Sequence, residues 1–122
     1  MNEKKILIVD DEKDVLVTVG KRLASEGYAV ITADNGRDAV TMAKTKLPDI
    51  ILLDVLMSDM DGGEVAEKLK DDSRTKNIPV IFLTALLSKT EEYQDNHIVA
   101  GNITFAKPID TGELLTQIKK LL

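Results

Sequence analysis

The 122-residue sequence predicts an α/β fold, a doubly wound parallel sheet of five strands with five helices on its two faces. Five short apolar segments alternate along the chain with segments whose apolar residues recur at helical spacing. One of them, residues 50–53, contains no polar residue, which is typical of a parallel strand buried on both faces. Because consecutive parallel strands are joined by right-handed crossovers, this alternation places helices on both sides of one sheet.

Each strand is expected where aliphatic residues form a short run between turn residues. The five runs cover residues 6–9, 28–33, 50–53, 80–83 and 103–106. The first helix carries Val15, Leu16, Val19 and Leu23, and four further helices cover residues 37–46, 64–70, 85–101 and 111–122. Gly27 and Pro48 stop the first two helices, and Thr111 is expected to cap the last one. The helical pattern over residues 85–101 is weak, so the ends of that helix are poorly defined.

Length and composition favour a single domain over residues 1–122. A chain of this length buries about two thirds of its unfolded surface in one core, and 43% apolar with 30% charged residues is typical of a soluble protein. The net charge of -5 argues against a nucleic-acid-binding surface. Only four apolar residues follow the charged amino terminus, too few for a signal peptide or a spanning helix. A cytoplasmic protein without membrane contact is therefore expected.

Metal chemistry is limited by the residue types present. The absence of Cys excludes disulfide bonds and thiolate metal sites. With His97 as the single histidine, oxygen ligands remain for metal binding. His97 itself is expected as a surface or partly packed helix residue, and not as a phosphorelay site.

Polar residues stand at the carboxyl ends of four predicted strands. They are Asp10 and Asp11, Asp54, Thr84, and Lys107. In open parallel sheets, ligands bind outside the carboxyl ends of the strands, so these side chains are expected to share one site. Three carboxylates suit Mg²⁺. Without a cation they repel one another, which should make some of them bind protons more tightly than isolated aspartates do.

Asp54 is the strongest single candidate, because an unpaired buried carboxylate is costly. A carboxylate can act as a nucleophile and form an aspartyl phosphate. A metal ion, the Lys107 ammonium and the Thr84 hydroxyl would then neutralise the phosphoryl oxygens. Taken singly, Asp10 or Asp11 is equally well a helix N-cap, Thr84 a strand-end residue, and Lys107 a solvated lysine. Chance placement at four separate strand ends is a weaker explanation than a shared site.

The chain resembles the receiver domains of response regulators in two-component signalling, of the single-domain chemotaxis type, over its whole length. The matching segments are Ile8-Val9-Asp10-Asp11-Glu12, Leu53-Asp54-Val55-Leu56-Met57 with Asp59-Met60-Asp61-Gly62, Thr84-Ala85 and Lys107-Pro108. The resemblance implies a flavodoxin-like sheet of order 2-1-3-4-5. It also implies a Lys-Pro bond that is commonly cis.

The same resemblance implies roles for the site residues. Asp54 would be the phosphoacceptor. Asp10, Asp11 and Asp54 would hold Mg²⁺ together with the backbone carbonyl of Leu56. Thr84 and Lys107 would contact the phosphoryl group.

The resemblance implies partners as well. The phosphoryl donor would be a sensor histidine kinase or a histidine phosphotransfer protein, docking over the first helix near Val15 and the loop at Pro108-Ile109. A stand-alone receiver is expected, which catalyses only its own phosphorylation and dephosphorylation and signals through contacts with a downstream protein. The acidic residues 59–61 are expected in a solvated loop.

Two positions depart from the usual family pattern. Ser58 replaces a proline, which loosens the loop after Asp54. Thr104 stands where an aromatic residue is usual, and Phe105 follows it, on the opposite face of a strand. An aromatic movement coupled to Thr84 is therefore disfavoured, and residues 85–101 are an alternative route for the signal.

Leu56 and Leu86 occupy the positions that flank the phosphoryl group in the family. Both are apolar, so neither can orient an attacking water, and slow self-dephosphorylation is predicted.

Two other classes of function are the alternatives to a receiver domain. A small Mg²⁺-dependent phosphatase of the haloacid dehalogenase type requires a second acid two residues after its nucleophile and a capping insertion. This chain has Leu56 at the position of the second acid, and its 122 residues leave no room for the insertion. A nucleotide or flavin binder requires a glycine- or hydroxyl-rich phosphate-binding loop after the first strand. In this chain Asp10, Asp11 and Glu12 follow that strand, and they would repel phosphate unless a cation intervened.

Overall fold

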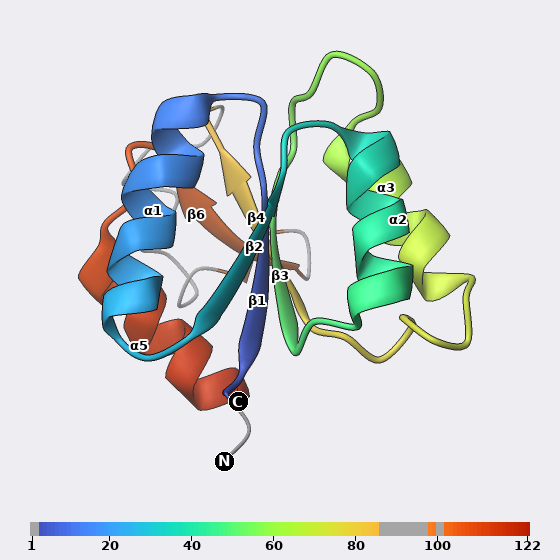
Figure 1. The fold of residues 1–122 in the computed structure, drawn as a ribbon. Helices are drawn as coiled ribbons and strands as arrows, with labels where there is room; N and C mark the ends of the chain where they lie inside the picture. Colours follow the sequence, from blue (N-terminus) through green and yellow to red (C-terminus); the bar gives the residue numbers. More distant parts are fainter. Residues whose placement is uncertain (1–2, 86–97, 100–101) are drawn as a thin grey trace.

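The computed structural model describes residues 3–85, 98–99 and 102–122, which form one sheet between two layers of helices (Figure 1). The strands are β1 (Lys5–Val9), β2 (Ala29–Ala33), β3 (Ile50–Asp54), β4 (Val80–Thr84), β5 (Ile98–Val99) and β6 (Asn102–Ala106). The helices within the described ranges are α1 (Lys13–Ser25), α2 (Gly36–Lys46), α3 (Gly62–Lys70) and α5 (Thr111–Leu121). None of these helices is long and apolar enough to cross a membrane.

The strands lie in the order β2-β1-β3-β4-β6-β5. The pairings from β2 through β6 are all parallel, so the predicted order 2-1-3-4-5 is confirmed with β6 as its fifth strand. β5 was not predicted and pairs antiparallel with β6. The helix expected over residues 85–101 is thus wrong for Ile98 and Val99, which pair with β6 as a short strand, because Ile and Val are residue types that favour strands. The rest of that expected helix lies outside the described residues.

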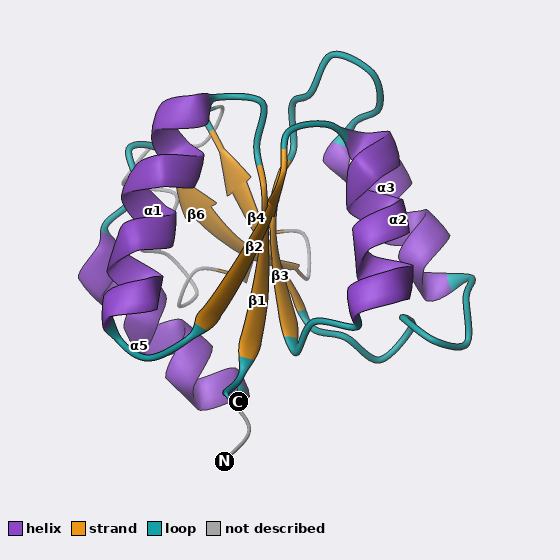
Figure 2. Cartoon of the chain, viewed as in Figure 1, coloured by secondary structure: helices purple, strands orange, loops and turns teal. Residues whose placement is uncertain are grey.

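The two helix layers bury the two faces of the sheet (Figure 2). α1 and α5 cover one face and α2 and α3 the other, as the alternation of strands and helices predicts. Successive residues of β3 alternate between the two cores: Ile50 and Leu52 face α1 and α5, whereas Ile51 and Leu53 face α2 and α3. Burying one such side chain contributes about 1.5–3 kcal/mol. β3 therefore has a fixed register, which aims the residue at its carboxyl end.

Acidic or amide side chains begin three of the helices. Asn35 accepts a hydrogen bond from Asp38 N–H (2.8 Å) at α2, and Asp61 accepts one from Glu64 N–H (2.9 Å) at α3. α2 begins one residue and α3 two residues earlier than predicted, because these caps precede the apolar pattern.

The predicted cap of the last helix is wrong. The cap is Asp110, which accepts a hydrogen bond from Glu113 N–H (3.1 Å), and Thr111 is the first helical residue. A carboxylate at this position also interacts favourably with the helix dipole. The predicted stop of α1 is confirmed by Gly27, whose φ of 94° lies in the left-handed region.

Candidate functional site

Four strand ends form the site at one edge of the sheet. Backbone hydrogen bonds continue the strand pairing one residue past the strands, from Val55 N–H to Leu83 O (2.9 Å) and from Lys107 N–H to Thr84 O (2.9 Å). This continuation fixes the backbone on which the site side chains stand. Asp10 follows β1, Asp54 ends β3, Thr84 ends β4 and Lys107 follows β6, so the predicted residues are brought together.

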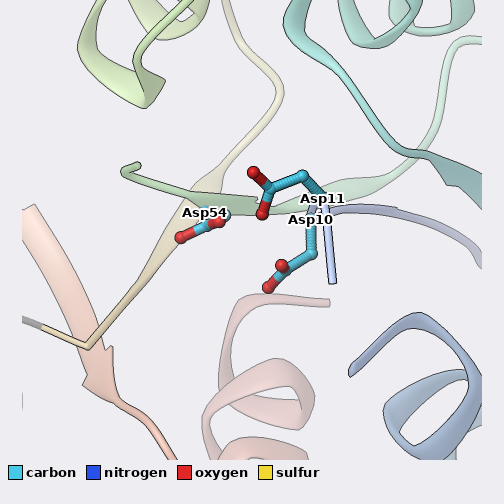
Figure 3. A group of neighbouring side chains, drawn as sticks. All are labelled: Asp10, Asp11 and Asp54. Carbon is cyan, nitrogen blue, oxygen red and sulfur yellow. The ribbon is translucent and has the colours of Figure 1, made fainter. Parts of the chain in front are cut away.

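Asp10, Asp11 and Asp54 gather beside the ends of β1 and β3 (Figure 3). One carboxylate oxygen of each lies within 4.8 Å of the others. Asp10 and Asp54 are buried, whereas Asp11 is exposed. Carboxylate oxygens at this spacing, with one acid open to solvent, are the donor set that suits a hard divalent cation.

The alternative that Asp10 is only a helix cap is wrong. The N-cap of α1 is Glu12, and its own side chain makes no capping hydrogen bond. Asp10 instead accepts a hydrogen bond from the Glu12 N–H at its Oδ1 (2.9 Å), which leaves Oδ2 turned to the site.

Lys107 reaches three carboxylates. Its Nζ lies 2.7 Å from Asp10 Oδ2, 2.8 Å from Glu12 Oε1 and 3.5 Å from Asp54 Oδ1. Asp10 Oδ2 is fully buried, and its close partner is a cation, the Lys107 ammonium. A buried carboxylate oxygen that already faces a positive charge can also serve as a ligand of a metal cation. The residues present therefore fit Mg²⁺.

The site perturbs the proton affinities of its own groups. Burial raises the pKa of Asp54 to about 6, and the neighbouring Asp10 carboxylate adds to this shift while Lys107 opposes it. Burial by itself lowers the pKa of Lys107, but contacts with the carboxylates of Asp10 and Glu12 outweigh burial and raise it overall. Asp54 thus binds its proton more tightly, as expected, but burial contributes more to the shift of its pKa than repulsion by the other acids does.

The loop between β3 and α3 is held by contacts with backbone atoms. Gly62 N–H donates to Val55 O (2.8 Å), which closes the loop onto the end of β3. A Cβ on Gly62 would lie 2.6 Å from the backbone oxygen of Asp54, so only glycine fits there. The N–H of Leu56 donates to Asp54 Oδ1 (3.3 Å), and the Leu56 side chain is 49% exposed at the rim of the site.

Asp59 has a structural role that sequence reasoning missed. Asp59 is exposed in a loop, as predicted, and in addition its Oδ1 and Oδ2 accept hydrogen bonds from Gly36 N–H (2.9 Å) and Arg37 N–H (3.1 Å). These two bonds lower the pKa of Asp59 and tie the loop to the start of α2. The contact spans 22 and 23 residues, so no local pattern in the sequence indicates it.

Thr104 and Phe105 lie on opposite faces of β6, as expected. Phe105 is fully buried in the core under α1 and α5. Thr104 is also buried and donates through Oγ1 to the Asn102 carbonyl (3.2 Å). Lys107-Pro108 is a cis peptide bond, as the resemblance implied. Leu86 and His97 lie outside the described residues.

The family model of the response regulator receiver domain matches residues 6–119. The chain belongs to this family. Receiver domains are the phosphoacceptor modules of two-component signal transduction, and they bind Mg²⁺ at an acidic pocket. The resemblance drawn from the sequence is therefore confirmed.

Known proteins similar to this receiver domain agree with the assignment. The response regulator PleD of Caulobacter vibrioides is 42% identical over 117 residues, which is 96% of this chain and 26% of that protein. The alkaline phosphatase synthesis transcriptional regulatory protein PhoP of Bacillus subtilis is 35% identical over 121 residues, covering 98% of this chain and 48% of that protein. This chain thus spans about a quarter and about half of the lengths of these two relatives.

The fold of this chain is also similar to that of a solved structure. The chemotaxis protein CheY4 of Vibrio cholerae has a TM-score of 0.84 at 30% identity, over 99% of this chain and 100% of that chain.

Proposed function

We propose that Asp54 is the phosphoacceptor of this receiver domain. The observation that carries the proposal is the convergence of Asp10, Asp11, Asp54 and Lys107 from strands that are far apart in the sequence. Asp54 is 3% exposed, so it meets solvent only at the rim of the sheet. Its pKa of about 6 still leaves it largely ionised at pH 7.5, which a nucleophile requires.

Phosphoryl transfer needs alignment and charge neutralisation more than covalent help from the protein. A carboxylate oxygen of Asp54 attacks phosphorus and forms a P–O bond. The P–N bond to the donor histidine breaks, and its electron pair remains on the imidazole nitrogen. Lys107, held 3.5 Å from Asp54 Oδ1, is placed to contact the oxygens of the transferred group, and Thr84 at the end of β4 is assigned the same role.

The metal site is assigned to the carboxylates of Asp10, Asp11 and Asp54 and to the backbone carbonyl of Leu56. Bound there, Mg²⁺ would supply positive charge to the phosphoryl oxygens. The closed loop after β3 supports the use of a backbone carbonyl, because the Gly62 contacts hold that segment beside Asp54.

The proposed donor is a sensor histidine kinase or a histidine phosphotransfer protein. A groove of about 460 Å³ opens next to Lys107 and is lined by Val15 and Val19 of α1 and by Pro108 and Ile109 before α5. Its apolar walls beside the reactive edge support docking of the donor there. The output is proposed to be contact with a downstream protein, without nucleic-acid binding or catalysis beyond the chain's own phosphorylation and dephosphorylation. Residues 1–122 are proposed to act as one domain.

The test is intact-mass analysis after incubation with acetyl phosphate and Mg²⁺. The protein should gain one phosphoryl group, Asp54→Asn should gain none, and the exposed-site variant Asp71→Asn should gain it normally. Omitting Mg²⁺ or replacing Asp11 with Asn should lower the yield. An equal adduct on Asp54→Asn, or no adduct on the unchanged protein, would remove the proposal.

A further inference from the structure

Glu12 is an unusual residue for its place at the start of α1. Helix N-caps are usually Ser, Thr, Asp or Asn, whose short side chains bond the first turn of the helix. Glu12 is the N-cap of α1, yet its side chain makes no such bond. Its carboxylate reaches Lys107 instead, with Oε1 accepting a hydrogen bond from Nζ (2.8 Å) across 95 residues of sequence. The side chain therefore serves the site and not the helix.

The Lys107 ammonium is shared unequally among its three carboxylate neighbours. Asp10 and Glu12 lie within 2.8 Å of Nζ, whereas Asp54 lies at 3.5 Å. Asp10 and Asp54 belong to the acidic cluster that could hold a metal ion, and Glu12 does not. The Lys107 side chain is 11% exposed and that of Glu12 is 59% exposed, so Glu12 holds the ammonium from the solvent side.

A divalent cation and the ammonium compete for the same two carboxylates. If Mg²⁺ binds as proposed above, its charge repels the ammonium from Asp10 and Asp54. If the Lys107 ammonium had no carboxylate partner beside the bound metal ion, repulsion between the two positive charges would weaken metal binding. Glu12 stands outside the metal cluster and keeps a carboxylate in contact with Nζ, so it can retain Lys107 while Asp10 changes partner.

We propose that Glu12 is a positioning residue that holds the Lys107 ammonium when Mg²⁺ occupies the acidic cluster, and so strengthens Mg²⁺ binding. The inference rests on the metal site of the proposed function. Glu12 acts through Lys107 and not as a metal ligand. Because an exposed ion pair adds little to folding stability, its effect belongs to metal binding and not to the unfolding of the protein.

A double-mutant cycle separates action through Lys107 from a general effect of charge. Mg²⁺ affinity is measured by isothermal titration calorimetry on the unphosphorylated protein, with no transfer reaction involved. The variants are Glu12→Gln, Lys107→Met and the two combined. Asp14→Asn is the matched control: Asp14 is an exposed acid in the first turn of α1, and the described ion pairs of Lys107 do not include it.

The expected result is that Glu12→Gln weakens Mg²⁺ binding by roughly three- to tenfold while Lys107 is present. In the Lys107→Met background the same substitution should change affinity by less than about twofold, because the ammonium that Glu12 holds is gone. Asp14→Asn should also stay within about twofold, since it removes a charge of the same sign without the contact. Thermal melts in EDTA should show that all variants are folded.

An equal loss of affinity in both backgrounds would overturn the proposal, because Glu12 would then act on the metal directly. Unchanged affinity in Glu12→Gln would overturn it as well, and would leave the phosphoacceptor assignment intact. Absence of Mg²⁺ binding by the unchanged protein would remove the metal site itself, and with it the role of Glu12.

Discussion

The two sides of the site are held by different kinds of interaction. On the side of α1 and α5, Lys107 is fixed by ion pairs with Asp10 and Glu12. On the side of α2 and α3, the loop after Asp54 is fixed by contacts with backbone atoms, through Gly62 and Asp59. Ion pairs respond to cations, pH and salt, whereas hydrogen bonds to backbone amides and steric fit respond much less. One side can therefore rearrange while the other keeps its shape.

This difference suits a site that must accept a charged group and later lose it. The ammonium can change partners as charge enters the cluster, because three carboxylates lie within its reach. The backbone carbonyl of Leu56, proposed above as a metal ligand, would have to stay in place, and the closed loop after β3 would keep it there. The predictions below test the fixed side and the charged side separately, from the largest expected effect to the smallest.

Gly62→Ala should break the fixed side. The added methyl group would lie 2.6 Å from the Asp54 carbonyl oxygen and 2.9 Å from Val55 Cα, and both are backbone atoms that cannot move aside. Overpacking of this kind should lower the free energy of unfolding by about 3 kcal/mol, measured by urea denaturation. Gly112→Ala is the control, because its new methyl group would have ordinary contacts and should stabilise α5 by up to about 1 kcal/mol. Equal effects of the two substitutions would contradict the steric argument.

Asp54→Asn should stabilise the protein at neutral pH in EDTA. The pKa of Asp54 is raised from 3.8 to about 6, so the folded state binds its proton more tightly than the unfolded state. By linkage, the contribution of Asp54 to stability is fully present below pH 4 and is lost as the pH rises to 6. Replacing the carboxylate should therefore add roughly 1–3 kcal/mol at pH 7.5.

Urea denaturation as a function of pH checks this prediction. The gain from Asp54→Asn should shrink towards zero near pH 4, and Asp71→Asn should shift stability by less than about 0.5 kcal/mol throughout. A gain that does not depend on pH would mean that the charge of Asp54 is not what destabilises the fold.

Leu56→Asn should shorten the lifetime of the phosphorylated protein. Leu56 is half exposed beside Asp54 and has no polar atom to orient an attacking water. On a loop that keeps its shape, an amide at this position should speed phosphate loss by roughly tenfold or more. Decay is followed by intact mass after removal of acetyl phosphate, with Leu56→Met as the apolar control. An unchanged rate of phosphate loss both in Leu56→Asn and in a polar variant of Leu86 would contradict this prediction.

Asp59→Ala should loosen the tie between the loop and α2. Both hydrogen bonds to the Gly36 and Arg37 amides disappear, whereas Asp59→Asn keeps one acceptor oxygen and should have a smaller effect. Amide hydrogen exchange at these two residues should therefore be fastest in Asp59→Ala, intermediate in Asp59→Asn and slowest in the unchanged protein. Identical exchange rates in all three would show that the contact does not hold the loop.

Much of the fold could be predicted because its pattern is local. Residues 50–53 are all apolar and are all fully buried in β3, since a strand covered on both faces leaves no position for a polar side chain. β5 could not be predicted, because two residues carry too little pattern to compete with a helical interpretation of their surroundings. The cap at Asp110 was missed because two adjacent residues are both good caps, and only the backbone decides between them.

The site divides in the same way. Asp54 could be found from the sequence because a carboxylate directly after a buried strand stands out. Lys107 could be grouped with it because both residues follow predicted parallel strands, whose carboxyl ends meet at one edge of the sheet. The contacts of Glu12 and Asp59 could not be found from the sequence, because each depends on a partner brought close only by the folded sheet. Acidic residues in loops are common and usually solvated, so their local sequence does not distinguish these two from the others.

The central place of β1 has a consequence for incomplete chains. β1 lies between β2 and β3, and the ammonium that faces its acids arrives only after β6, so the reactive edge draws on nearly the full length of the polypeptide. A chain that stops before Lys107 keeps the residues of β1 and β3 but lacks the ammonium that faces their acids. If Lys107 has the role proposed above, such a fragment would lack a group needed for phosphoryl transfer.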